Sequence, residues 1–380
     1  MTISRRSFLQ FSAAATATIR CVLPGALPAS ALELPRVDQN EGLIRLNSNE
    51  NAYGPSGAVV KAIKSAVASS NRYPRMQYDA LAEQIANTHK VSPEQVLLGC
   101  GSTELLRMAA CAFLGNRRRL VRAWPSFEAI GYYAQVVGAE VVSVPLTRAF
   151  AHDLDGMLMH ADASTGLVYV CNPNNPTASL TPRKDLEAFI GRLPASTFVV
   201  MDEAYHHYAG NSGMYASFID RPVDDGRVIA VRTFSKIYGL AGLRVGYAIG
   251  SLQSIQQMRK FAIQDNVNAI ATQAAAAALD DTDGVHESVR RNTNDVQEFF
   301  NQAMARSLKP IDSHANFVMM NTFQPAEEAV VHFRKNNILI EGGPQPMETY
   351  VRVSLGLPQE MLAFWRAWDA RPHGKVMMHH

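Results

Sequence analysis

The pattern of apolar and polar positions divides this chain of 380 residues into regions. From about residue 78, helical patterns alternate with short apolar runs that are bounded by polar turns. Runs of this length between helices are typical of strands buried in a mostly parallel sheet. We therefore predict a large, doubly wound α/β domain with a mixed, mostly parallel sheet. Its strands are expected at residues 96–99, 119–124, 140–146, 166–172, 197–204 and 227–235.

The pattern changes beyond residue 265, where longer helical stretches precede three further apolar runs. The helical stretches are "ATQAAAAAL" and "NTNDVQEFFNQAMA", and the strand candidates are "ANFVMMN", "NNILIEG" and "TYVRVSLG". This order predicts a smaller α+β domain after the large one. The expected divisions are a leader over 1–31, an N-terminal arm and part of the small domain over 32–71, a large domain over 72–264 and the small domain over 265–380.

The first thirty residues predict an export signal. "SRRSFLQ" contains the arginine pair Arg5 and Arg6, a mildly apolar Ala/Thr stretch follows, and "ASA" at 29–31 resembles a cleavage site. A disordered basic N-terminus is the alternative interpretation. The stretch is too short and too weakly apolar for a stable membrane anchor. We therefore expect export by the twin-arginine machinery of a bacterial cell, to the periplasm or beyond.

Charge and cysteine content exclude several classes of partner. Three arginines and no acidic residue fall in the segment 1–31, so the rest of the chain is close to neutral. A nucleic-acid partner therefore has no compositional support. Cys100, Cys111 and Cys171 form no C-x-x-C pair and are odd in number, so the sequence suggests neither a disulfide framework nor a metal site.

Four polar clusters follow apolar runs of the large domain. They are "GCGSTELL" after 96–98, "NPNNPT" after 167–171, "DEAYHHY" after 198–201 and "TFSK" after 228–232. Ligands of open α/β sheets bind outside the carboxyl ends of the strands, so the four clusters are expected to meet at one edge. Each cluster alone is weak evidence, but their coincidence predicts a functional site.

An amine, a carboxylate and a phosphate cradle at one edge indicate pyridoxal phosphate. Lysine forms Schiff bases with carbonyl compounds, and this cofactor is held by such a lysine with an acidic partner at its ring nitrogen. Lys236 is the candidate amine, and Gly239 and Gly242 are expected to turn the backbone so that Arg244 reaches the phosphate. The predicted phosphate ligands are Ser102 and Thr103 at a helix start, Ser235 and Arg244.

These motifs resemble those of the fold type I pyridoxal-phosphate aminotransferases, and the chain is most similar to the histidinol-phosphate aminotransferase family. The resemblance runs from about residue 43 to 368. It is carried in order by "LNSNENAYGPS", "RYPRMQYDAL", "LLGCGSTELL", "VYVCNPNNPTAS", "VVMDEAYHHYAG", "RTFSKIYGLAGLRVGYAIG", "ANFVMMN" and "YVRVSLG". The segment with the lysine is the most specific of these motifs.

The resemblance implies a role for each cofactor residue. Lys236 would form the Schiff base and move the proton during catalysis, and Asp202 would pair with the protonated ring nitrogen. Asn175 and Tyr205 would hydrogen-bond the 3-oxygen of the ring, and Phe127 would stack on it. Ser102, Thr103, Ser235 and Arg244 would bind the phosphate.

The resemblance also implies substrate and subunit contacts. Arg352 would bind the α-carboxylate of an amino donor or of a 2-oxo acid acceptor. Asn49 or Tyr53 would line the substrate entrance. Tyr73 would reach the phosphate of a neighbouring subunit, which implies a homodimer with shared active sites.

Two positions depart from the family pattern. Ala178 replaces a usual glycine, and Glu341 stands where the family commonly has an arginine that helps to bind the phosphate of the substrate. A carboxylate repels a phosphate, which argues against histidinol phosphate and favours a donor with a neutral or cationic side chain. An export leader is also unexpected for a histidine-biosynthesis enzyme.

The leading hypothesis from the sequence is an aminotransferase. A pyridoxal-phosphate-dependent decarboxylase, lyase or racemase is the alternative, because the lysine and the aspartate serve all of these reactions. A non-catalytic binding protein is disfavoured, since every reactive position is filled. His206, His207 and His314 are expected to be structural, or to support site residues from behind, rather than to act as ligands.

Overall fold

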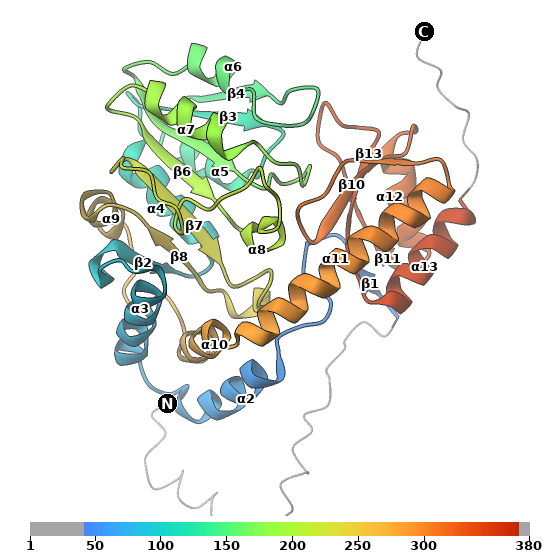
Figure 1. Ribbon diagram of the computed structural model, residues 1–380, viewed down its shortest axis with the longest axis horizontal. Coiled ribbons are helices and arrows are strands. Elements are labelled where there is room, and N and C mark those ends of the chain that lie inside the picture. The colour runs from blue at the N-terminus through green and yellow to red at the C-terminus, as the bar shows by residue number, and fades with distance from the viewer. Residues whose placement is uncertain (1–41, 372–380) are drawn as a thin grey trace, which may run out of the picture. The chain divides into compact units, whose positions relative to one another are not determined.

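The computed structural model describes residues 42–371, so the predicted leader lies outside the described residues. A seven-stranded sheet with strand order β2-β8-β7-β6-β5-β3-β4 forms the centre of the large domain (Figure 1). β8 pairs antiparallel with both of its neighbours, and the other neighbouring pairs are parallel. The strands are β2 (Val96–Gly99), β3 (Arg119–Trp124), β4 (Val141–Pro145), β5 (Thr165–Cys171), β6 (Phe198–Asp202), β7 (Val228–Thr233) and β8 (Gly246–Ile249).

The predicted α/β fold and its mostly parallel sheet are confirmed. Six of the strands fall on the predicted runs, with ends that differ by at most two residues. The strand β8 was not predicted, because its four residues follow a glycine-rich turn and are too few to show a periodic pattern of apolar residues. Since β8 is antiparallel to β2 and to β7, these two strands point the same way and their carboxyl ends share one edge.

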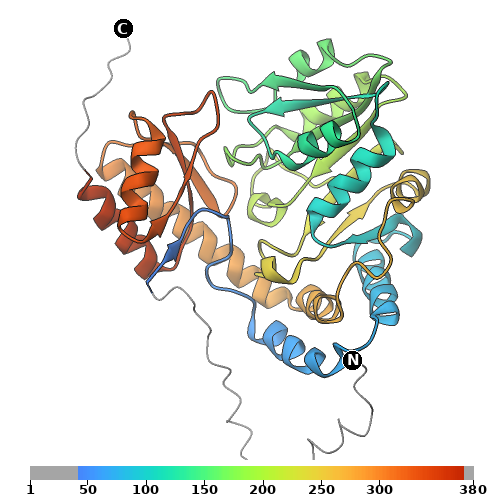
Figure 2. The ribbon, with the colours of Figure 1, turned by 180° about the vertical axis from the view of Figure 1, so that it is seen from behind.

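Helices cover both faces of the sheet, which is why its strands are apolar on both sides. One face packs on α3 (Arg75–His89), α6 (Leu154–Met159) and α7 (Arg183–Arg192). The other face, seen from behind in Figure 2, packs on α4 (Ser102–Phe113), α5 (Ala129–Val136) and α9 (Leu252–Arg259). Along β5 the side chains alternate between these two apolar cores, as the period of a strand requires.

The small domain contains a four-stranded antiparallel sheet of order β12-β13-β10-β9. Its elements are β9 (Lys309–Pro310), β10 (Phe317–Asn321), α12 (Ala326–Lys335), β11 (Ile338–Leu339), β12 (Glu341–Gly342), β13 (Tyr350–Ser354) and α13 (Pro358–Asp369). The long helix α11 (Thr282–Ala305) runs along this domain (Figure 1). The N-terminal segment joins it through β1 (Ile44–Arg45), which pairs in parallel with β11.

The helices α2 (Gly57–Ala66) and α10 (Ala269–Asp280) pack together beside α3. Alanines of α10 belong to the apolar core of the large domain, although α10 follows the expected domain boundary at residue 264. The described chain is completed by the short helices α8 (His206–Ala209), η1 (Val67–Ser69), η2 (Pro93–Gln95) and η3 (Ala241–Leu243). Within residues 42–371, no helix is both long enough and apolar enough to cross a membrane.

Candidate active site

A cavity of about 300 Å³ lies at the edge of the large sheet where β5, β6 and β7 end. It brings together ten of the residues predicted from the sequence: Ser102, Thr103, Phe127, Asn175, Asp202, Tyr205, Ser235, Lys236, Arg244 and Arg352. Asn49, one of the two candidates for the entrance, also lines the cavity, with Ser48, Glu50, Cys171, Ala204, Thr233 and Ala241. Since these residues come from both domains, the cleft forms only when both are folded.

Lys236 follows β7 and supplies the amine of the cleft. Its Nζ donates hydrogen bonds to the backbone carbonyls of Asn49, at 3.0 Å, and Ser48, at 3.4 Å. Burial, helped by the nearby positive charge of Arg352, lowers the pKa of Lys236 to about 8. A substantial fraction of this amine is therefore unprotonated at mildly alkaline pH, as attack on an aldehyde requires.

Asp202 is the last residue of β6 and lies in the buried part of the cleft. Its Oδ2 accepts a 2.8 Å hydrogen bond from the hydroxyl of Tyr169, and its Oδ1 accepts a 3.1 Å bond from the backbone N–H of Ala204. Burial raises the pKa of Asp202 to about 6, and the hydrogen bond from Tyr169 opposes that rise. The carboxylate is therefore mostly ionised at neutral pH and suits a cationic ring nitrogen.

The phosphate end of the cleft is built by the start of α4 and by Arg244. Gly101 precedes α4 with φ +75°, and no side chain caps the N-terminus of this helix. Ser102 and Thr103 of the first turn line the cleft, so the positive end of the helix dipole faces it. A Cβ at Gly101 would overlap the Arg244 guanidinium, which explains the glycine. Arg244 donates to Ser235 Oγ at 3.4 Å. A cation, a hydroxyl and a helix N-terminus at one end, with Asp202 at the other, fit pyridoxal phosphate.

The turn before Arg244 differs in part from the expectation. Gly239 has φ +67°, and a Cβ there would strike the backbone of Gly54 and Pro55, so glycine is required. Gly242 has open space around it and its φ is not positive, so the prediction that a glycine is needed there for the turn was wrong. Arg244 itself adopts the left-handed conformation, with φ +57°.

Arg352, on β13, extends from the small domain into the cleft. Its guanidinium donates to Asn175 Oδ1 and to the carbonyl of Asn47, each at 2.7 Å. Its buried Nε has no hydrogen-bond partner in the structure, so donor capacity remains for an anion such as a carboxylate. Nearby, the Tyr205 hydroxyl accepts a 3.0 Å bond from Asn49 Nδ2, and burial raises the pKa of Tyr205 so that it stays protonated.

Three predicted residues do not line this cavity. Tyr53 donates instead to Asp295 on α11, at 3.1 Å, and lies under Arg291. Tyr73 is 80% exposed. Glu341 lines a neighbouring cavity of about 350 Å³, which shares Phe127, Asn175 and Arg352 with the cleft. The role of Tyr53 at the substrate entrance thus stays a prediction.

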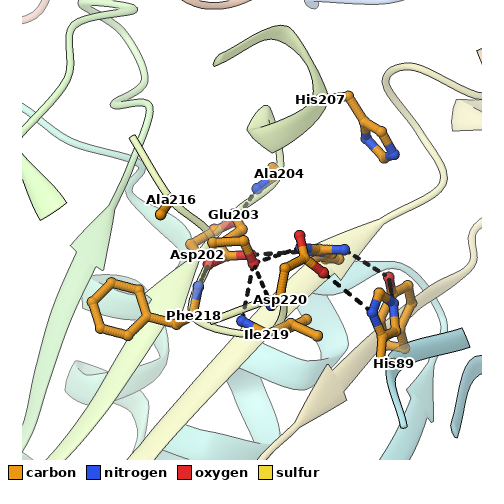
Figure 3. A network of polar contacts seen from close by, with 12 residues as sticks. His89, Asp202, Glu203, Ala204, His207, Ala216, Phe218, Ile219 and Asp220 are labelled. Carbon is orange, nitrogen blue, oxygen red and sulfur yellow. Dashed lines mark hydrogen bonds and ion pairs between the residues drawn. The ribbon is translucent and has the colours of Figure 1, made fainter. Parts of the chain in front are cut away.

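A buried polar network lies behind the cleft and was not predicted (Figure 3). Glu203, next to Asp202, forms an ion pair of 3.1 Å with Arg232, which also pairs with Asp220 at 3.0 Å. Glu203 accepts a further bond from the backbone N–H of Phe218. Because a buried carboxylate is stable only when it is paired and hydrogen-bonded, this network fixes the chain that follows Asp202. Asp220 in turn contacts His89, at 3.4 Å.

The histidines predicted to be structural lie outside the cleft. His206 and His207 are held neutral by burial, which lowers the pKa of His207 to about 3. His207 bonds the hydroxyl of Tyr238, and His314 pairs with Asp312. Ala178, at the usual glycine position, is buried with φ +58°, a conformation in which glycine is less strained.

Comparison with known proteins identifies the family. Residues 41–364 match the family model "Aminotransferase class I and II". The histidinol-phosphate aminotransferase of Caldicellulosiruptor saccharolyticus is 34% identical over 351 residues, which cover 92% of this chain and 97% of that protein. The structure of histidinol-phosphate aminotransferase from Sinorhizobium meliloti in complex with pyridoxal-5'-phosphate superposes with a TM-score of 0.81 at 29% identity, covering 85% and 89% of the two chains.

The chain belongs to the aminotransferase class I and II family, and the two similar proteins named above are histidinol-phosphate aminotransferases. The predicted aminotransferase activity and the pyridoxal phosphate cofactor are thereby confirmed. The fold alone does not decide the reaction. An L-threonine-O-3-phosphate decarboxylase from Porphyromonas gingivalis shares it with a TM-score of 0.75 at 20% identity, over 86% of this chain and 98% of that one.

Proposed function

We propose that this aminotransferase moves the amino group of a non-phosphorylated amino acid or amine to a 2-oxo acid. The observation that carries the proposal is the meeting of Lys236, Asp202 and Arg352 in one cleft. Arg352 holds the α-carboxylate, Lys236 exchanges the α-proton, and Asp202 keeps the ring nitrogen of the cofactor protonated. Pyridoxal phosphate, when bound, would supply the electron sink.

A screen of amino donors tests this assignment. For each donor consumed, transamination releases one 2-oxo acid from an amino acid, or one aldehyde or ketone from an amine, and leaves the cofactor able to return to its starting form with an acceptor. Carbon dioxide release or loss of optical activity without a 2-oxo acid would instead indicate decarboxylation or racemisation. Purified enzyme with each donor, assayed for all three products, separates these reactions.

Glu341 sets the charge at the far end of the proposed substrate site. Glu341 lies opposite Arg352 in the register of β12 and β13. Burial lowers the pKa of the Arg352 guanidinium, and the negative charge of Glu341 opposes that change. The cavity beside it is also lined by Glu128 and by one basic residue, Arg352, which binds the α-carboxylate in this proposal. Two carboxylates in a cavity of this size disfavour a phosphate and favour a neutral or cationic group.

We expect histidinol phosphate to be a poor donor, with kcat/KM roughly a hundredfold or more below that of the natural donor. Glu341→Arg should move the preference toward phosphorylated donors, because it reverses the charge that the phosphate meets. Steady-state kinetics with histidinol phosphate and histidinol measure the effect. Glu348→Arg is the control, since Glu348 is exposed, as Glu341 is, but lies outside the cavity lining. Efficient turnover of histidinol phosphate by the wild type would contradict this role of Glu341.

A homodimer is part of the proposal. Tyr73 is exposed in the single chain, as expected for a side chain that completes the phosphate site of a second subunit. Met76, in the first turn of α3, is also 82% exposed, so a second exposed apolar side chain lies close to the tyrosine in sequence. Light scattering of the purified protein checks the assembly, and a monomeric mass would exclude a shared site.

Export by the twin-arginine route is supported by the leader sequence alone. We expect that changing Arg5 and Arg6 together to lysine leaves the folded, yellow precursor in the cytoplasm, because the machinery reads the arginine pair. Cell fractionation followed by immunoblotting measures this. Arg20→Lys is the control, since it changes an arginine of the leader outside the pair. Unchanged export of the double variant would mean that another route is used.

A further inference from the structure

A tyrosine of the central sheet is bonded to the carboxylate of the active site. Tyr169 lies within β5, is fully buried and donates the 2.8 Å hydrogen bond to Asp202 Oδ2. In the strand register, Tyr169 faces Val200 and Cys171 faces Asp202. Tyr169 is thus the diagonal neighbour of Asp202 on the same sheet face, within reach of a long side chain. The register of two buried strands therefore fixes this contact.

Tyr169 is suited to donate this hydrogen bond at every working pH. Burial and the nearby Asp202 charge raise the pKa of the Tyr169 hydroxyl well above its ordinary value, so it stays protonated. Two other ionisable groups affect the pKa of Asp202. They are Lys236, which also lines the cleft, and Glu203, which forms an ion pair with Arg232. The Cys171 thiol beside it also stays protonated, because burial raises its pKa.

We propose that Tyr169 is a positioning residue for the reaction. Its hydroxyl holds Asp202 Oδ2 in place and stabilises the negative charge of the carboxylate through the hydrogen bond. A carboxylate that accepts a strong hydrogen bond binds a proton less tightly. The proton between Asp202 and the ring nitrogen of the cofactor then stays on the nitrogen, which is the form that withdraws electrons from the substrate. This inference rests on the cofactor assignment, and it gives a role to Tyr169, to which the sequence analysis assigned none.

The test is Tyr169→Phe, which removes the hydroxyl and keeps the ring. We expect kcat to fall about tenfold or more, with KM within about twofold, because a hydrogen bond to a charged group is lost and substrate contacts are kept. The second measurement is independent of turnover. In enzyme loaded with ¹⁵N-labelled pyridoxal phosphate, the ring nitrogen resonance should move from the protonated toward the neutral position.

Tyr78→Phe is the matched control, since its hydroxyl bonds the Leu98 carbonyl at 3.4 Å and lies outside the cleft lining. This variant should keep the wild-type kcat and nitrogen resonance. A Tyr169→Phe enzyme with an unchanged resonance and kcat would overturn the proposal, whatever its melting temperature. The cofactor assignment is checked separately, since the wild type alone must bind pyridoxal phosphate and show a protonated ring nitrogen.

Discussion

Lys236→Ala should reduce turnover by roughly 10⁴-fold or more, because no other amine in the cleft replaces the covalent bond and the proton transfer. Lys236 donates only to the backbone carbonyls of Ser48 and Asn49, so its loss leaves no buried charge and the chain should still fold. Loosely bound cofactor should remain, because the phosphate cradle and Asp202 are untouched.

Two measurements decide the role of Lys236. The first is single-turnover kinetics with the best amino donor. The second is the absorbance band at roughly 420 nm that is typical of a lysine-bound cofactor. This band should disappear in the variant. Lys260→Ala is the control, because Lys260 is exposed at the end of α9. If Lys236→Ala kept both the band and the activity, the central assignment would be wrong.

The sequence predicted the edge of the sheet that carries the site, for a physical reason. Buried parallel strands need continuous apolar runs, and the chain must become polar where each run meets the ligand. Ser102, Asn175 and Lys236, which follow three of those runs, line the cleft. The local sequence pattern was sufficient to predict these site residues, because each one comes shortly after the end of a strand.

Residues whose roles depend on pairing between distant segments could not be predicted in this way. Tyr169 looks like any apolar strand residue, and only the register of β5 on β6 brings its hydroxyl to Asp202. The ion pairs of Arg232 likewise depend on the path of the chain after β6. The contact of Tyr53 depends on tertiary structure in the same way, since its hydroxyl is bonded to Asp295 on α11.

Asp202→Asn should keep the fold and lower kcat by roughly 10³-fold, because a neutral amide cannot hold the proton on the ring nitrogen. The shape is nearly unchanged, and the amide oxygen can still accept the bond from Ala204 N–H or from Tyr169. What is lost is the partly desolvated ion pair with the cofactor, which contributes several kcal/mol, on the order of 3–4, to the transition state.

The measurements for Asp202→Asn are kcat, KM and the dissociation constant of pyridoxal phosphate from the apoenzyme. Affinity for the cofactor should fall along with kcat, whereas a change confined to KM would contradict the proposed role. Asp295→Asn is the control, because Asp295 is a partly buried carboxylate that, like Asp202, accepts a hydrogen bond from a tyrosine hydroxyl, that of Tyr53. Since Asp295 lies outside the cleft lining, its variant should bind the cofactor as the wild type does. A similar loss in both variants would show that the rate depends on general stability and not on a charge beside the ring nitrogen.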